Sequence, residues 1–118
     1  MNKKELENRL IDFSVKVTDY VVNLENHPAI IHLRDQAIRS GTAVSLNYAE
    51  AQSAESRKDF IHKLGIVIKE LRETQVNLKM IKRFTKSPED NVLGWLLNES
   101  DQLLAIFHRT IMTAKMNS

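Results

Sequence analysis

A chain of 118 residues is long enough to bury one substantial hydrophobic core but not two, so we expect residues 1–118 to form a single domain. Hydrophobic residues make up 42% of the chain and charged residues 27%, a balance typical of soluble globular proteins. The lack of cysteine excludes disulfides and thiolate metal sites and fits a reducing compartment. Since no apolar run approaches the length of a signal-peptide core or a membrane span, we expect a cytoplasmic protein with no membrane partner.

The first expected helix starts near Asn2, a candidate N-cap, and continues to about residue 24. The chain has only three glycines and two prolines, which favours long helices joined by short loops. Apolar residues recur in this segment at alternating spacings of four and three, as they do along one face of a helix. The stripe consists of Leu6, Leu10, Phe13, Val17, Tyr20 and Leu24.

The second expected helix begins at Pro28, where a proline costs no hydrogen bond. Its inward stripe consists of Ile30, Leu33, Ala37, Gly41, Val44, Tyr48 and Ala51. Many side chains of this helix are small, and small side chains let a neighbouring backbone approach closely. We therefore predict that it is the tightly packed central helix.

The third expected helix begins after Ser56, which together with Asp59 resembles a capping box, and ends near residue 85. Its stripe consists of Phe60, Leu64, Val67, Leu71, Thr74, Leu78 and Ile81. For the fourth helix, Ser87 is the predicted cap and Pro88 the predicted first residue. Its stripe consists of Leu93, Leu96, Leu97, Leu103, Leu104, Phe107 and Ile111. These patterns predict an all-α, antiparallel up-down-up-down four-helix bundle.

Metal chemistry is not indicated in this bundle. A ferritin-like di-iron site needs Glu-x-x-His on two helices, and no glutamate here is followed three residues later by histidine. The four histidines, His27, His32, His62 and His108, lack the spacing of zinc ligands. We expect no metal and no cofactor.

Arg57 and His62 match the Arg-x4-His pattern of helical ribonucleases of the HEPN type. Five residues on a helix place the two side chains about 140° apart, and a capped helix start explains Arg57 equally well. We expect a protein that is not an enzyme and keep a helical ribonuclease as the third alternative.

Positive charge is concentrated in one segment of the chain. Residues 56–87 carry nine basic and three acidic side chains, whereas the whole chain has a net charge of +2. At about 100° per residue, six of them fall in one outward stripe, the basic ridge: Lys58, Lys69, Arg72, Lys79, Arg83 and Lys86. Such a ridge predicts binding to the phosphate backbone of RNA or DNA; an ordinary solvated lysine-rich face is the alternative. No aromatic residue is interleaved with it, so stacking on single strands is not indicated.

Polar side chains also line the flanks of the second and third helices that could face each other. They are Arg39, Asn47 and Glu50 on the second helix and Lys63, Glu70 and Glu73 on the third. We predict that they form a partly buried polar network between helices or between subunits. The alternative is that both flanks are simply solvated.

Three stretches of the centre of the chain have a specific pattern: residues 36–51 (QAIRSGTAVSLNYAEA), 56–64 (SRKDFIHKL) and 69–74 (KELRET). They resemble the 23S ribosomal RNA intervening-sequence proteins, a bacterial family related to the accessory variability proteins of diversity-generating retroelements. The resemblance covers about residues 5–110. The pattern matches Arg39, Ser40, Asn47, Glu50, Ser56, Phe60, Lys63, Glu70 and Glu73.

The resemblance implies an antiparallel four-helix bundle assembled as a ring-like homopentamer, and a role with RNA and a partner such as a reverse transcriptase. Assembly is also expected from apolar residues outside the stripes, which would leave large exposed patches on a monomer. They are Ile11, Val22, Ile61, Ile66, Ile68, Val76, Trp95 and Ile106. We predict a homo-oligomer that binds RNA or DNA through the ridge, with a protein-interaction scaffold as the alternative.

Overall fold

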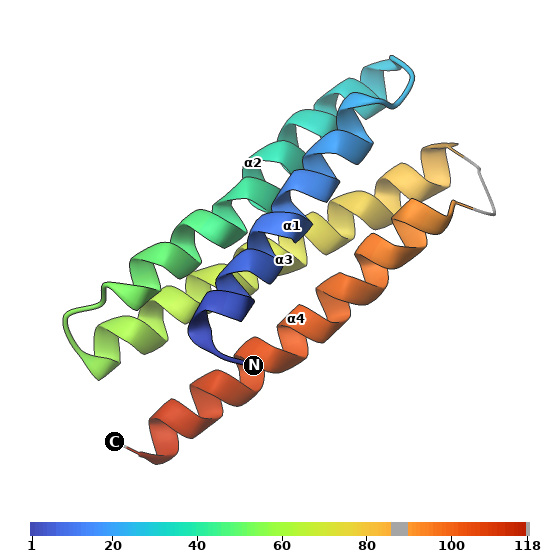
Figure 1. The fold of residues 1–118 in the computed structure, drawn as a ribbon. Helices are drawn as coiled ribbons and strands as arrows, with labels where there is room; N and C mark the ends of the chain where they lie inside the picture. The colour runs from blue at the N-terminus through green and yellow to red at the C-terminus, as the bar shows by residue number, and fades with distance from the viewer. Residues whose placement is uncertain (86–89, 118) are drawn as a thin grey trace.

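The computed structural model describes residues 1–85 and 90–117. They form four helices: α1 (Lys3–Val22), α2 (Pro28–Gln52), α3 (Arg57–Thr85) and α4 (Asn91–Met116). Consecutive helices run in opposite directions along a bundle 47 Å long (Figure 1). The predicted all-α fold is confirmed, and the described residues contain no strand.

Each helix contacts the helices that precede and follow it, and α1 also contacts α4. The contact between α2 and α3 is the most extensive, and that between α1 and α4 is the least. The backbones of described helices that lie diagonally opposite, such as α1 and α3, do not approach each other closely, and these helices meet only through side chains in the core. The bundle is thus a four-sided arrangement that is tightest at α2–α3 and loosest where α4 meets α1.

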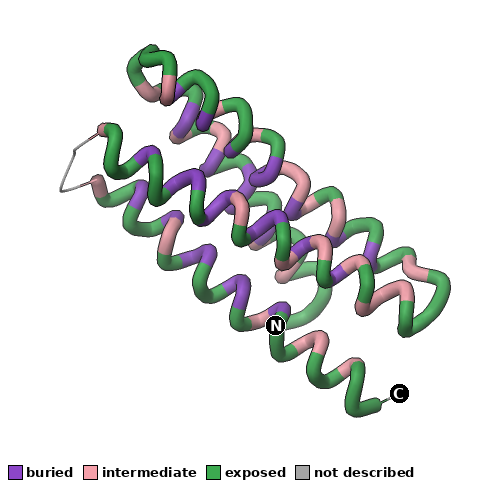
Figure 2. Tube along the Cα trace, turned by 180° about the vertical axis from the view of Figure 1, so that it is seen from behind, coloured by how far each residue is buried: buried purple, intermediate pink, exposed green. Residues whose placement is uncertain are grey.

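The four predicted stripes meet in one continuous core, with the buried residues on the inner side of each helix (Figure 2). All seven predicted positions of α2 are buried. At the stripe ends, Leu6, Phe60 and Ile111 are only half-buried. An ideal Cβ on Gly41 would lie 3.0 Å from Val17 Cγ1, so the missing side chain of this glycine lets α1 approach α2 closely. This contact agrees with the prediction that the second helix packs closely against its neighbours.

Three of the helix starts are those that the sequence indicates. Asn2 Oδ1 accepts a hydrogen bond from the backbone N–H of Glu5 at 2.8 Å, and Ser56 Oγ accepts one from Asp59 N at 3.1 Å. Pro28 is the first residue of α2. Side-chain oxygens therefore satisfy backbone donors that a helix start leaves without partners.

The fourth helix begins later than predicted. Asp90 has an extended backbone and is the N-cap, because its Oδ1 accepts from Leu93 N at 3.0 Å. The predicted cap Ser87 and first residue Pro88 lie outside the described residues. Since Asp90 is the N-cap, α4 begins at Asn91 and not at the predicted first residue. No described helix has the length and the apolar character needed to cross a bilayer.

Candidate nucleic-acid interface

The basic ridge lies along the exposed side of α3. Five of its six predicted members are exposed: Lys58, Lys69, Arg72, Lys79 and Arg83. The sixth, Lys86, lies outside the described residues. At 1.5 Å per residue, the helix from Lys58 to Arg83 is about 37 Å long. The ridge is therefore a stripe of cations that extends along most of the length of the bundle.

The acidic side chains of α3 are engaged away from the ridge. Glu70 and Glu73 form ion pairs with Arg39 of α2, with N–O distances of 3.3 and 2.5 Å. Asp59 lies in the first turn of α3, where its carboxylate accepts from Glu55 N at 3.4 Å. These three are the only acidic residues among residues 56–87, and in the described structure none of them forms an ion pair with a ridge cation.

Four ridge cations, Lys58, Lys69, Lys79 and Arg83, form no ion pair with any residue in the part of the chain that the structure describes. Arg72 differs, because it donates a hydrogen bond to Gln75 Oε1. The amide of Gln75 donates in turn to Asp101 Oδ1 of α4 at 2.6 Å. Arg72 is thus held toward α4 and contributes less to the ridge than the sequence alone indicates.

The polar side chains that were predicted to lie between α2 and α3 form two separate clusters. Arg39 lies between Glu70 and Glu73, which explains how two carboxylates three residues apart share one flank. The hydrogen bond to Glu73 and the charge of Glu70 raise the pKa of the Arg39 guanidinium above its ordinary value. Lys63 and Glu50 form a separate pair at 3.7 Å. Asn47 joins neither cluster, since its amide donates to Ala43 O within α2 at 2.8 Å.

An ion pair that the sequence analysis missed joins α1 to α4. Arg9 donates to both carboxylate oxygens of Glu99, from Nε at 2.8 Å and from Nη2 at 2.7 Å. Its Nη2 also donates to Gln102 Oε1 at 2.8 Å. The hydrogen bond to Glu99 raises the pKa of Arg9, against the opposing effect of burial. The sequence feature that could have indicated this ion pair is Glu99, an acidic residue that lies between the stripe positions Leu96 and Leu103 of the fourth helix.

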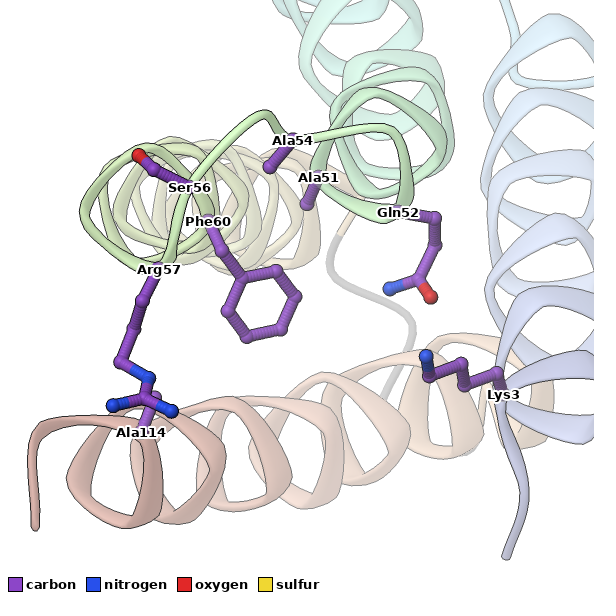
Figure 3. Close-up of a pocket in the computed structure, with 8 residues that line it drawn as sticks. All are labelled: Lys3, Ala51, Gln52, Ala54, Ser56, Arg57, Phe60 and Ala114. Atoms are coloured by element: carbon purple, nitrogen blue, oxygen red, sulfur yellow. The ribbon is translucent and has the colours of Figure 1, made fainter. Parts of the chain in front are cut away.

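The cavity between the start of α3 and the end of α4 bears on the ribonuclease alternative (Figure 3). Arg57 extends from α3 toward α4, where it donates a hydrogen bond to the backbone oxygen of Asn117. His62 is exposed, one and a half turns further along α3. Arg57 therefore has a structural partner at the end of α4. The described residues also contain no group of histidine and acidic side chains that could hold a metal ion.

The fold thus defines a small antiparallel four-helix-bundle protein with one strongly basic outer face. A model of the 23S rRNA-intervening sequence protein family matches residues 3–109, and the chain belongs to this family. Among curated proteins, none matches the chain.

A similar solved structure is the crystal structure of a protein of unknown function from the S23 ribosomal protein family of Bacteroides thetaiotaomicron. Its sequence is 28% identical, and the superposition has a TM-score of 0.80. The match covers 89% of this chain and 96% of that chain. The likeness therefore extends over nearly the whole of both proteins.

Proposed function

We propose that this protein binds RNA or DNA without catalysis, through the basic ridge on α3. The observation that supports the proposal most directly is the position of the acidic residues. Glu70 and Glu73 pair with Arg39 of α2 and with no ridge cation, so Lys69, Lys79 and other ridge cations keep their charge available. Mobile counterions gather along such a row in solution, and a phosphate backbone that replaces them gains the entropy of their release.

We further propose that the protein assembles with copies of itself, and that the outer face of α1 and α2 is the contact. Of the apolar residues outside the stripes, Ile68 and Ile106 pack against the core. Others remain exposed, and five of these exposed large apolar side chains form the α1–α2 face: Ile11, Val15, Val22, Ile31 and Leu46.

Helical geometry groups four of these five residues. At 100° per residue, Ile11, Val15 and Val22 share the side of α1 that is turned toward α2 and away from the core. The hydroxyls of Ser14 and Ser45, 2.6 Å apart, place Leu46 of the antiparallel α2 at the level of Ile11 and Val15. The result is a row of exposed apolar side chains along two helices, which contact with another copy would remove from water.

A closed oligomer with this contact would repeat the ridge once per subunit and leave it uncovered, because the ridge lies on the exposed side of α3 and the contact on the outer sides of α1 and α2. Each copy would add weak phosphate contacts at high effective concentration, so a short ridge on each subunit suffices for firm binding. The number of subunits that we propose is five, and it comes from the family resemblance.

A second candidate function is a scaffold that binds another protein, such as a reverse transcriptase, and no nucleic acid. The α1–α4 side favours it: Val92 and Trp95 of α4 are exposed, and Lys16 of α1 lies over the Trp95 ring at 4.1 Å from its centroid. Exposed tryptophan is enriched where proteins meet. This surface is separate from the α1–α2 face.

Fluorescence anisotropy with a labelled, structured RNA distinguishes the two functions. If the ridge binds phosphates, affinity falls steeply as salt rises from about 50 to about 200 mM, since every phosphate contact releases a counterion. A DNA duplex of the same length shows whether RNA is preferred. Affinity that does not depend on salt, or no binding at low salt, rules out the ridge and leaves the scaffold.

A further inference from the structure

A cavity of about 530 Å³ opens at the end of the bundle where α1 leads into α2 and where α3 ends. Its walls include Leu24, Asn26, His27, Ile30 and Phe84, and we call it the end pocket. Phe84 directly follows Arg83, the last described cation of the basic ridge. The pocket therefore lies beside one end of the ridge, and its volume is within the range of small-molecule sites.

Aromatic and apolar surface makes up much of the end pocket. The Phe84 side chain is large and apolar, yet Phe84 is 52% exposed. Its ring lies 6.1 Å from that of His27, with the two planes tilted by 37°. Leu24 and Ile30 supply aliphatic surface beside them. A flat aromatic ligand could cover the bare part of Phe84 and gain stacking that water does not provide.

The polar groups of the pocket fit the edge of a nucleobase. His27 Nδ1 accepts from Ala29 N at 3.1 Å, so the neutral ring carries its proton on Nε2 and can donate it. Asn26 Oδ1 already accepts from Arg34 at 3.0 Å, which fixes the amide with its N–H₂ group left to donate. Glu25, which is exposed, offers carboxylate oxygens as acceptors. Donors and acceptors together match the mixed pattern that bases present.

The charges around the end pocket favour an uncharged base over a phosphate. Glu25 and Asp90 both line the end pocket, and two carboxylates disfavour an anion there. Arg83, next to Phe84 in the chain, supplies positive charge beside the pocket. A nucleotide could therefore place its phosphate on the ridge and its uncharged base in the cavity.

We propose that the end pocket binds an unpaired nucleobase of an RNA whose backbone lies on the basic ridge, with the base stacked on Phe84. This inference rests on the proposed nucleic-acid binding. It adds to that function a preference for paired RNA that ends in, or is interrupted by, unpaired nucleotides. The ridge alone would treat all duplexes of one length alike, because phosphate contacts carry no information on pairing.

The test compares two labelled RNA duplexes of about 16 base pairs, the length that a double-stranded RNA domain spans. One is blunt, and the other carries a short unpaired uridine tail at one end. Wild-type protein should bind the tailed duplex about tenfold more tightly, as expected for one base stacked on an aromatic ring. Phe84→Ala should remove this preference and leave the affinity for the blunt duplex unchanged. Phe84→Tyr keeps the ring and should retain the preference.

Arg83→Gln is the matched control, since it should weaken binding of both duplexes and keep their ratio. A 4-thiouridine in the tail, activated by light, should crosslink to the peptide that contains His27 or Phe84. Equal affinity for the two duplexes, or crosslinks only elsewhere, overturns the pocket and leaves ridge binding intact. If neither duplex binds at low salt, the proposed function fails, and the inference fails with it.

Discussion

Tyr20 Oη donates a hydrogen bond to Asp90 Oδ2 over 2.6 Å, which joins α1 to the first turn of α4. The second oxygen of the same carboxylate caps α4 through Leu93 N. One side chain thus starts the fourth helix and fixes it to the first, on the side of the bundle where helix contacts are least extensive.

The first prediction concerns this hydrogen bond. Tyr20→Phe removes the phenolic oxygen and should lower the free energy of unfolding at neutral pH by about 1 kcal/mol, the usual contribution of one hydrogen bond. Tyr48 is the control, since no hydrogen bond of its hydroxyl is seen among the described residues and Tyr48→Phe should change stability less. Urea unfolding followed by circular dichroism measures both. Equal effects of the two substitutions would contradict the tethering role of Tyr20.

The same tyrosine predicts a pH dependence. Burial and the hydrogen bond to Asp90 raise the pKa of Tyr20 above its ordinary value of 10.0. Burial likewise raises the pKa of Tyr48. A raised pKa means that the folded protein holds the proton more tightly, so the stabilisation is complete below about pH 10 and declines as the pH rises above it. The free energy of unfolding should fall less steeply with rising pH in Tyr20→Phe than in the wild type. An unchanged slope would show that Tyr20 titrates alike in the folded and the unfolded protein.

The third prediction uses two glycines in helix interiors. Alanine at Gly65 meets no neighbouring atom within 4 Å, so Gly65→Ala should stabilise the protein by about 0.5–1 kcal/mol through helix propensity alone. At Gly41 the added carbon would lie 3.0 Å from Val17 Cγ1, in a fully buried contact. Gly41→Ala should therefore lose that gain and destabilise by about 1 kcal/mol. A stabilised Gly41→Ala variant would show that α1 and α2 can move apart freely.

The fourth prediction compares two ion pairs. The side chains of Arg9 and Glu99 are 27% and 9% exposed, whereas those of Lys63 and Glu50 are 28% and 63% exposed. Arg9→Met leaves a nearly buried carboxylate without its guanidinium and should cost about 2 kcal/mol, less than for a fully buried pair. Lys63→Met should cost no more than about 0.5 kcal/mol. Double-mutant cycles with Glu99→Gln and Glu50→Gln isolate each coupling energy, and similar values would refute the ranking.

Sequence periodicity predicts the core of this protein well because each helix has one apolar stripe and the loops are short. The start of α4 is different, since the serine–proline signal predicts an earlier start, whereas Asp90 caps the helix and accepts a hydrogen bond from Tyr20, a partner that periodicity does not reveal. Side-chain partners across helices were also hard to predict. Arg9 and Glu99 are 90 residues apart in the chain, and their pairing depends on the angle at which α1 meets α4.

The candidate site likewise has one part that the sequence predicts and another that it does not. The basic ridge follows from spacing on one helix, so the sequence places its members on one exposed side. The pairing of two aromatic rings at the end of the ridge does not follow from spacing, because His27 precedes α2, Phe84 belongs to α3, and the two meet only in the folded bundle. The orientation of Arg72 toward α4 likewise depends on Gln75 and Asp101, which no periodicity connects.

The last prediction concerns assembly. Light scattering coupled to size exclusion should give the mass of a closed oligomer at micromolar concentration, and five chains is the number that we propose. Val15→Lys and Leu46→Lys place charges on the α1–α2 face, where the wild-type residues are 60% and 66% exposed, and should shift the protein to smaller species. Because both side chains are exposed, neither substitution should unfold the bundle, which circular dichroism can verify.

Val92→Lys is the matched control, since Val92 is 52% exposed on α4 and lies outside the α1–α2 face. It should leave the mass unchanged. A wild-type mass of one chain would disprove assembly, and a mass that only Val92→Lys reduces would place the contact on α4. Val15→Lys leaves the ridge intact. If it gives smaller species and also weakens RNA binding, the repetition of the ridge in the oligomer accounts for the affinity. Separate subunits lose the effective concentration that assembly provides.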